Sequence, residues 1–127
     1  MRKLGLFVLI LVTGLAYIRL APVKVTLTKF PSAVGDYAVA GGFTAVREIS
    51  GSVNAAAVEA AMVALPRTVK VADAPPTFIT RSRVFGFPDV TVVAEEAGHL
   101  VVSGNLVYGR GDLGVNRARI LALLSAL

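Results

Sequence analysis

Arginine and acidic side chains recur in the C-terminal half of the chain and could form a charge network or a recognition surface. Side chains two residues apart share one face of a strand, so Arg81 and Arg83 are expected on the same face. The same spacing groups polar residues on the next two predicted strands: Asp89, Thr91 and Glu95 on one, Ser103 and Asn105 on the other. If these faces coincide, one side of the sheet is polar. It would be either an ordinary solvated surface, with ion pairs worth ~0.2–1 kcal/mol each, or a recognition surface.

The segment Gly109-Arg110-Gly111-Asp112-Leu113-Gly114 matches the dinucleotide-binding fingerprint letter for letter, between a predicted strand and a predicted helix. A dinucleotide site also needs a second parallel strand and an acidic residue about 20 positions further on. Neither follows in this sequence. We therefore expect a tight glycine turn in which Asp112 caps the helix and accepts the backbone N–H of Gly114 or Val115.

The start of the same helix is also a candidate anion site, because free backbone N–H groups at a helix start attract negative charge. Arg110, Arg117 and Arg119 lie close to it in the sequence. Arginine in a first helical turn opposes the helix dipole, so these side chains need either carboxylate partners or a bound anion. The candidate residues for a structural network or a recognition site are Arg81, Arg83, Asp89, Arg110, Asp112, Asn116 and Arg117.

The composition excludes several kinds of active site. The sequence has no cysteine, which excludes a disulfide framework, a zinc-thiolate site, an iron–sulfur cluster and a cysteine nucleophile. His99 is its one histidine, so a two-histidine metal set is excluded as well. Glu95 and Glu96 are adjacent, so on a strand they point to opposite faces and cannot act as a pair. We expect no enzyme activity, no cofactor and no metal.

The formal net charge of +5 does not indicate nucleic-acid binding. Three of the 13 basic residues, Arg2, Lys3 and Arg19, lie in the first 21 positions, which hold no acidic residue. The rest of the chain carries 10 basic and 8 acidic residues. Because polyanion-binding surfaces show clustered Lys and Arg, we expect no nucleic-acid partner.

An uncharged, apolar run from Leu4 to Ile18 follows the two N-terminal basic residues. As a helix it would span about 22 Å, against a hydrocarbon core of roughly 30 Å, and snorkelling of Arg19 to the interface would lengthen it. We predict a membrane anchor over residues 1–21, with a cleaved signal peptide and a buried core helix as alternatives. The positive-inside rule then places the C-terminal domain in the periplasm, on a single-pass bacterial inner-membrane protein. Cleavage would instead release the domain into the periplasm.

The remaining chain reads as a linker over residues 22–34 and one α+β domain over residues 35–127. Six runs have the composition and turn boundaries of strands: Asp36–Ala40, Phe43–Ile49, Val69–Val71, Thr77–Phe85, Val90–Glu95 and His99–Tyr108. Two helices are predicted: Asn54–Ala64, and a final helix from Asp112 to Ala126 with Leu113, Ile120, Leu124 and Leu127 on one stripe. Hairpin-length connections favour an antiparallel sheet of about five strands with both helices on one face.

Two segments of this domain, Thr80–Asp89 and Gly109–Ile120, resemble a known family. They are similar to the bacterial and plastid family of uncharacterised domains numbered fourteen-ninety-nine in the domain-of-unknown-function series. The sequence departs from the family pattern at Leu106-Val107, where the family has a Ser-Arg pair, and at Gly111, where it has Ser. The resemblance implies a membrane-anchored member and assigns no activity.

These observations predict an interaction or structural module that is held at the membrane by Leu4–Ile18. Its partner would be a lipid or another protein of the cell envelope. The alternative is a protein that binds a lipid or another apolar small ligand between the sheet and the last helix, which rests on fold analogy alone. An apolar cavity of ~300 Å³ or more beneath that helix would favour this alternative.

Overall fold

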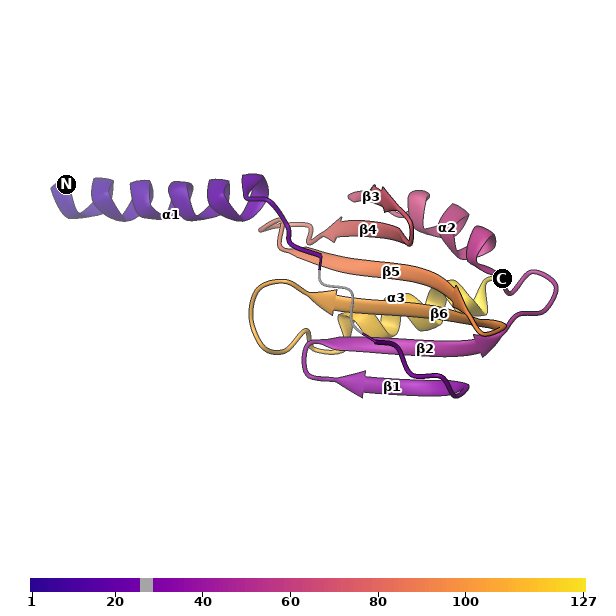
Figure 1. Cartoon of the computed structure of the whole chain (residues 1–127). Coiled ribbons are helices and arrows are strands. Elements are labelled where there is room, and N and C mark those ends of the chain that lie inside the picture. Colours follow the sequence, from indigo (N-terminus) through magenta and orange to yellow (C-terminus); the bar gives the residue numbers. More distant parts are fainter. Residues whose placement is uncertain (26–28) are drawn as a thin grey trace.

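Six antiparallel strands form one sheet, in the order β1-β2-β6-β5-β4-β3, in the computed structural model, which describes residues 1–25 and 29–127 (Figure 1). The strands are β1 (Gly35–Val39), β2 (Gly42–Glu48), β3 (Thr68–Asp73), β4 (Pro76–Arg81), β5 (Pro88–Glu96) and β6 (His99–Leu106). The α+β class and the antiparallel sheet are confirmed. The sheet has six strands rather than about five, because every predicted run pairs, including the short run that becomes edge strand β3.

Two predicted strands end earlier than expected. β4 ends at Arg81 because Ser82 closes a turn with Phe87: the Ser82 N–H donates to the Phe87 carbonyl, and the Phe87 N–H donates to Ser82 Oγ, both at 2.9 Å. Arg83 therefore lies exposed in the β4–β5 loop and not on a strand face beside Arg81. β6 likewise ends at Leu106, before Tyr108.

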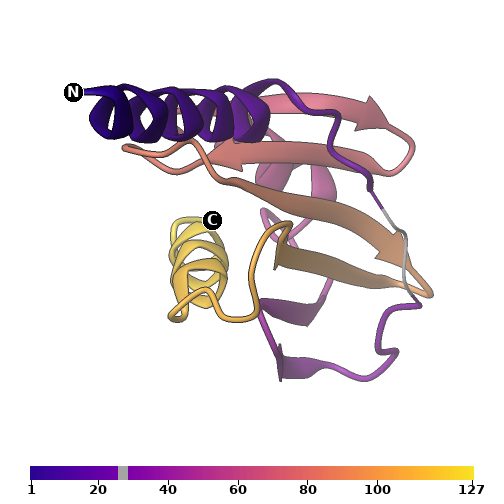
Figure 2. The ribbon, with the colours of Figure 1, turned by 90° about the vertical axis from the view of Figure 1, so that its left-hand side faces the viewer.

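Helices α2 (Ala55–Val63) and α3 (Val115–Ser125) pack on the same face of the sheet (Figure 2). Asn54 caps α2, because its Oδ1 accepts the Ala57 N–H at 2.9 Å. Both helices contribute to one buried cluster, which contains Val58, Met62, Ile120 and Leu123 from the helices and Phe43, Ala45, Phe78, Val93, Leu100 and Val102 from the strands. This shared core fixes where α3 begins relative to the strands.

The predicted apolar stripe of the last helix is wrong at its first position. Leu113 is fully exposed, because Gly114 has a left-handed φ of 76° and α3 begins only at Val115. Ile120 is fully buried, and Leu124 and Leu127 pack against the edge of the core.

The face of the sheet opposite the helices is also apolar. Val46, Val90, Val92 and Val101 are buried on this face. Described parts of the predicted linker lie against it, and Pro22, Val25 and Phe30 border a hollow of about 520 Å³ there; residues 26–28 of that linker lie outside the described residues. Burial on both faces of the sheet accounts for the apolar content of the domain.

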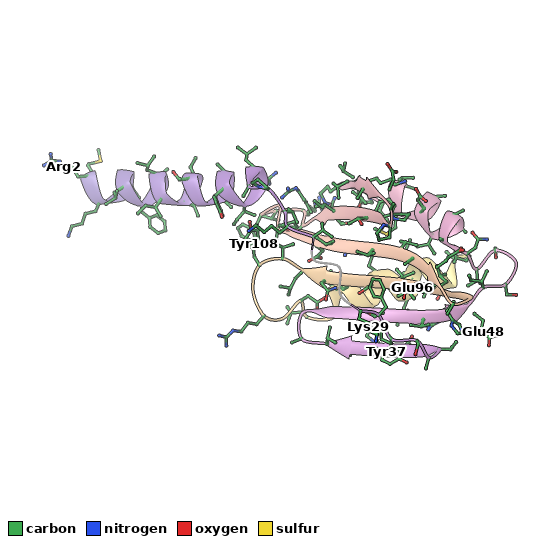
Figure 3. The ribbon with its side chains drawn as sticks, in the orientation of Figure 1. Arg2, Lys29, Tyr37, Glu48, Glu96 and Tyr108 are labelled. Atoms are coloured by element: carbon green, nitrogen blue, oxygen red, sulfur yellow. The ribbon has the colours of Figure 1, made fainter. Side chains whose placement is uncertain are left out.

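Helix α1 (Arg2–Leu20) extends away from the sheet, with Arg2 at its far end (Figures 1 and 3). Its 19 residues rise about 28 Å, and none of them is buried. The helix is long and apolar enough to cross a membrane.

Candidate functional site at the start of helix α3

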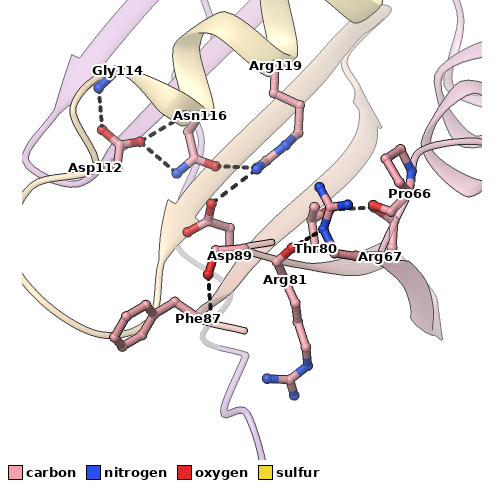
Figure 4. Close-up of polar contacts among 12 residues, drawn as sticks. Pro66, Arg67, Thr80, Arg81, Phe87, Asp89, Asp112, Gly114, Asn116 and Arg119 are labelled. Carbon is pink, nitrogen blue, oxygen red and sulfur yellow. Dashed lines mark hydrogen bonds and ion pairs between the residues drawn. The ribbon is translucent and has the colours of Figure 1, made fainter. Parts of the chain in front are cut away.

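Asp112 organises the turn between β6 and α3 (Figure 4). Its Oδ1 accepts the Gly114 N–H at 3.0 Å, and its Oδ2 accepts the backbone N–H and the side-chain amide of Asn116 at 2.9 and 2.8 Å. The predicted hydrogen bond from Gly114 is therefore confirmed. The predicted role of Asp112 as the cap of this helix is wrong, because the N-cap residue of α3 is Gly114, with no side-chain hydrogen bond to it. The Val115 N–H donates instead to the Asp112 backbone carbonyl at 3.1 Å, and the other backbone N–H at the carboxylate is that of Asn116.

Asn116 connects this turn to an ion pair on the sheet. Asn116 is fully buried, and its Oδ1 accepts a hydrogen bond from Arg119 Nη1 at 3.2 Å. Arg119 Nη2 in turn pairs with Asp89 Oδ2 at 3.2 Å, where the two side chains are 16% and 17% exposed. We call the four residues Asp112, Asn116, Arg119 and Asp89 the α3 network; it joins the start of α3 to the start of β5 (Figure 4).

Gly104 in β6 provides the space for this network. A Cβ on Gly104 would lie 2.6 Å from Asn116 Oδ1 and 3.2 Å from Ile120 Cδ1, closer than packed atoms normally approach. Glycine at this position therefore allows α3 to lie close against the sheet. The sequence analysis did not identify Gly104, although a glycine inside an alternating strand can signal the close approach of another element.

The two carboxylates of the α3 network have opposite pKa shifts. Burial raises the pKa of Asp89 above its ordinary value of 3.8, and the positive charge of Arg119 offsets this only in part. Burial also acts to raise the pKa of Asp112, but hydrogen bonds from Asn116 and Gly114 together outweigh it and lower that pKa. Asp112 is thus held ionised by its own turn, whereas the ionised form of Asp89 depends on Arg119.

The structure brings together three of the seven predicted site residues, namely Asp89, Asp112 and Asn116. Arg119 completes the network. It was not among the seven, although it was one of the three arginines expected to need a carboxylate partner or a bound anion. A signal for it existed, because residues three apart are neighbours on a helix surface, and Asn116 and Arg119 have that spacing. Only the position of α3 on the sheet shows that Arg119 reaches Asp89.

The other four predicted residues lie elsewhere. Arg110 is exposed in the turn before α3, and Arg117 is directed toward Phe43, with 5.9 Å between its guanidinium carbon and the ring centroid. Arg81 Nη1 donates to the carbonyls of Ile18 and Gly86, both at 3.0 Å. Arg81 thus joins α1 to the β4–β5 loop, where Arg83 also lies.

The predicted single polar face of the sheet is wrong. The register pairs Val92 with Ser103 and Thr91 with Gly104. Residues on the helix side are Asp89, Thr91 and Glu95, and those on the opposite side are Arg81, Ser103 and Asn105. On the helix side Glu95 accepts the Ala55 N–H at the start of α2, and on the opposite side Ser103 bonds to the Thr44 hydroxyl. These polar residues therefore do not form one recognition surface.

The Asp112 carboxylate occupies the position that an anion would take at the start of α3, since it accepts the N–H groups of Gly114 and Asn116. This arrangement favours carboxylate partners over a bound anion for the nearby arginine Arg119.

A cavity of about 260 Å³ borders the network beside Asp89 and Arg119. Within residues 1–25 and 29–127, no group of three or more His, Asp or Glu side chains could hold a metal ion. Because its donors and acceptors bond to one another, the α3 network is suited to linking elements.

We expect Asp112→Ala to lower the free energy of unfolding by about 0.5–2 kcal/mol, and Asp112→Asn to lose part of that amount. Asparagine offers one acceptor oxygen, whereas both oxygens of Asp112 accept here. Since the pKa of Asp112 is lowered on folding, its stabilisation is present above its ordinary pKa of 3.8 and is lost as the pH falls through the lower folded value. Chemical unfolding at neutral and acidic pH measures both effects. Unchanged stability in both variants would show that the turn holds without this carboxylate.

No family model matches the chain, and no curated protein or solved structure matches it. The resemblance to the family of uncharacterised domains numbered fourteen-ninety-nine therefore stays a prediction.

Proposed function

We propose that the chain is a single-pass bacterial inner-membrane protein whose α+β domain faces the periplasm and acts as an interaction or structural module. The observation that carries this proposal is the exposure of α1: an apolar helix of 19 residues without a buried residue. In water such a surface would be unfavourable, whereas a bilayer removes it from water. Arg2 and Lys3 at its start favour the orientation with the N-terminus in the cytoplasm.

The module role is supported by how the polar groups of the domain are used. The α3 network bonds internally, Glu95 binds the start of α2, and Lys70 pairs with Glu59 and Asp73. These side chains support the architecture of the sheet and its helices. A partner in the cell envelope, either a protein or a lipid, would then meet a preformed and rigid domain.

The alternative function, binding of a lipid or another apolar ligand between the sheet and α3, has less support. Ile120 is fully buried under α3 and Leu123 nearly so, and both belong to one cluster with Phe43, Leu100 and Val102. Side chains thus occupy the space in which the ligand would lie. The hollow of about 520 Å³ is on the other face of the sheet.

We expect the intact chain to fractionate with membranes and to resist extraction by high salt and carbonate. Leu9→Arg, which places a charge near the middle of α1, should make the protein extractable, because a central arginine costs about 2.5–3.5 kcal/mol on the insertion scale. Leu113→Arg is the matched control, since Leu113 is fully exposed on the domain, and it should fractionate like the unmodified chain.

Intact-mass analysis of the membrane fraction should show Met1 or Arg2 as the first residue, and protease added to spheroplasts should digest the domain. A mature form that begins near Tyr17 and is free in the periplasmic extract would contradict the anchor. That result would support secretion after cleavage of a signal peptide.

A further inference from the structure

The loop between β4 and β5, residues 82–87, lies beside the C-terminal half of α1 in both ribbon views (Figures 1 and 2). Two hydrogen bonds join them: Arg19 Nη2 donates to the Val84 carbonyl, and Arg81 Nη1 donates to the Ile18 carbonyl, both at 3.0 Å. The second bond satisfies one of the carbonyls that every helix leaves unpaired at its C-terminal end. The position of the loop along α1 is therefore fixed by two hydrogen bonds, one donated by α1 and one donated by the end of β4.

Apolar side chains also take part in the contact between loop and helix. Phe85 and Phe87, with ring centroids 5.9 Å apart, line a groove of about 490 Å³ together with Ile10, Leu11, Leu15 and Ile18 of α1. The loop also keeps large apolar side chains on the surface: Val84 is 70% exposed, Phe85 50% and Phe87 40%. Neighbouring exposed apolar side chains of this size commonly mark a surface that binds a membrane or another molecule.

The depth of the loop follows from its neighbours on α1. Ile10 and Ile18 are separated by about 12 Å along the helix axis. If Arg19 lies at the membrane interface, side chains that contact α1 between these residues lie within the outer half of the hydrocarbon layer. Phe85 and Phe87 line the groove alongside both residues.

Part of the loop backbone is paired in the way that such an environment requires. Hydrocarbon provides no hydrogen-bond partners, so backbone polar groups that enter it must be paired within the protein. The Gly86 N–H donates to the Ser82 carbonyl, and the Phe87 N–H donates to Ser82 Oγ. The carbonyls of Val84 and Gly86 accept from Arg19 and Arg81.

We propose that the loop of residues 82–87 is a second membrane contact, which inserts Phe85 and Phe87 into the outer leaflet against the C-terminal half of α1. Arg83, exposed in the same loop, and Arg19 are then placed to meet lipid phosphates, which arginine recognises by charge and paired hydrogen bonds. The occupant of the groove is an acyl chain of the bilayer. This inference rests on the proposed function, because it requires α1 to span the membrane.

The test uses tryptophan fluorescence, since the sequence contains no tryptophan. Three full-length variants, Phe85→Trp, Phe7→Trp and His99→Trp, are reconstituted in vesicles of phosphatidylcholine and phosphatidylglycerol whose acyl chains carry bromine, a quencher. Phe7→Trp reports insertion of α1. His99→Trp is the control in the domain. In the strand register His99 lies opposite Glu48 and Glu96, at the end of the sheet far from α1 (Figure 3).

The expected result is that brominated lipid removes most of the emission of Phe85→Trp and Phe7→Trp and little of that of His99→Trp. Quenching of Phe7→Trp without quenching of Phe85→Trp overturns the loop contact and leaves the anchor intact. Absence of quenching in Phe7→Trp overturns both. Equal quenching of Phe85→Trp and His99→Trp overturns the specific contact. Phe87→Trp is the second loop reporter, and it should behave like Phe85→Trp.

Discussion

Arg119→Met should lower the free energy of unfolding by about 3 kcal/mol at neutral pH, because it leaves the Asp89 carboxylate largely buried without its partner. Asp89→Asn should cost far less. The pKa of Asp89 is raised even with Arg119 in place, so folding makes the neutral carboxyl easier to form than it is in the unfolded chain. Asparagine resembles that neutral form. The double variant Arg119→Met/Asp89→Asn should therefore be more stable than Arg119→Met alone. Denaturant unfolding of the three variants measures this asymmetry.

The same argument predicts the pH dependence of Arg119→Met. A carboxyl whose folded pKa lies above the unfolded value of 3.8 binds its proton more tightly in the folded state. Stability therefore decreases as the pH rises from the unfolded pKa to the folded pKa. Loss of Arg119 removes a charge that lowers the pKa of Asp89 and thus widens this pH range. Acidification toward that range should recover part of the lost stability.

Arg117→Met is the matched control for this experiment. Arg117 lies on the same helix and contacts the Phe43 ring, an interaction worth about 0.5–1 kcal/mol at an exposed site. Losses of equal size in Arg117→Met and Arg119→Met would show that the ion pair with Asp89 has no special role.

Gly104→Ala should destabilise the domain by about 1–3 kcal/mol, a large effect for one added methyl group. Its Cβ would lie 2.6 Å from Asn116 Oδ1, so Asn116 or the whole of α3 must shift. Any shift weakens the bonds of Asn116 to Asp112 and Arg119, and it loosens the packing of Ile120. Thermal unfolding gives the change in stability, and hydrogen exchange of the α3 amides shows whether the helix moves.

Gly111→Ala is the control for Gly104→Ala. A Cβ on Gly111 would meet no atom within 4 Å, so the variant should stay within about 0.5 kcal/mol of the unmodified chain. If Gly104→Ala were as stable as Gly111→Ala, the close approach of α3 to β6 would not be a requirement of the fold.

Features set by a few neighbouring residues were predicted from the sequence. The hydrogen bond from the Gly114 N–H to Asp112 joins groups two residues apart. The prediction that α1 can cross a membrane also needs no tertiary information, since it depends only on the length and composition of the helix. Such features depend on local backbone geometry and side-chain type, both of which are visible in the sequence.

The face on which each polar residue lies depends on register, which the pattern within one strand does not contain. β5 and β6 are joined by two residues, Ala97 and Gly98, both with left-handed φ, so that Glu96 pairs with His99. The predicted strands end at Glu95 and begin at His99, which leaves residues 96–98 for the turn. A shift of one residue in register moves every side chain of a strand to the other face. The prediction of a single polar face is wrong for this reason.

The order of helices and strands, the apolar N-terminal helix and the Asp112 turn can be predicted from the sequence, because each is encoded by residues close together in the chain. Two contacts cannot be predicted in this way: Arg119 meets Asp89, 30 positions away, and Arg81 meets the end of α1. Both contacts depend on how closely one element approaches another. At α3 this distance is set by the absence of a side chain on Gly104, which becomes visible only when helix and sheet are packed together.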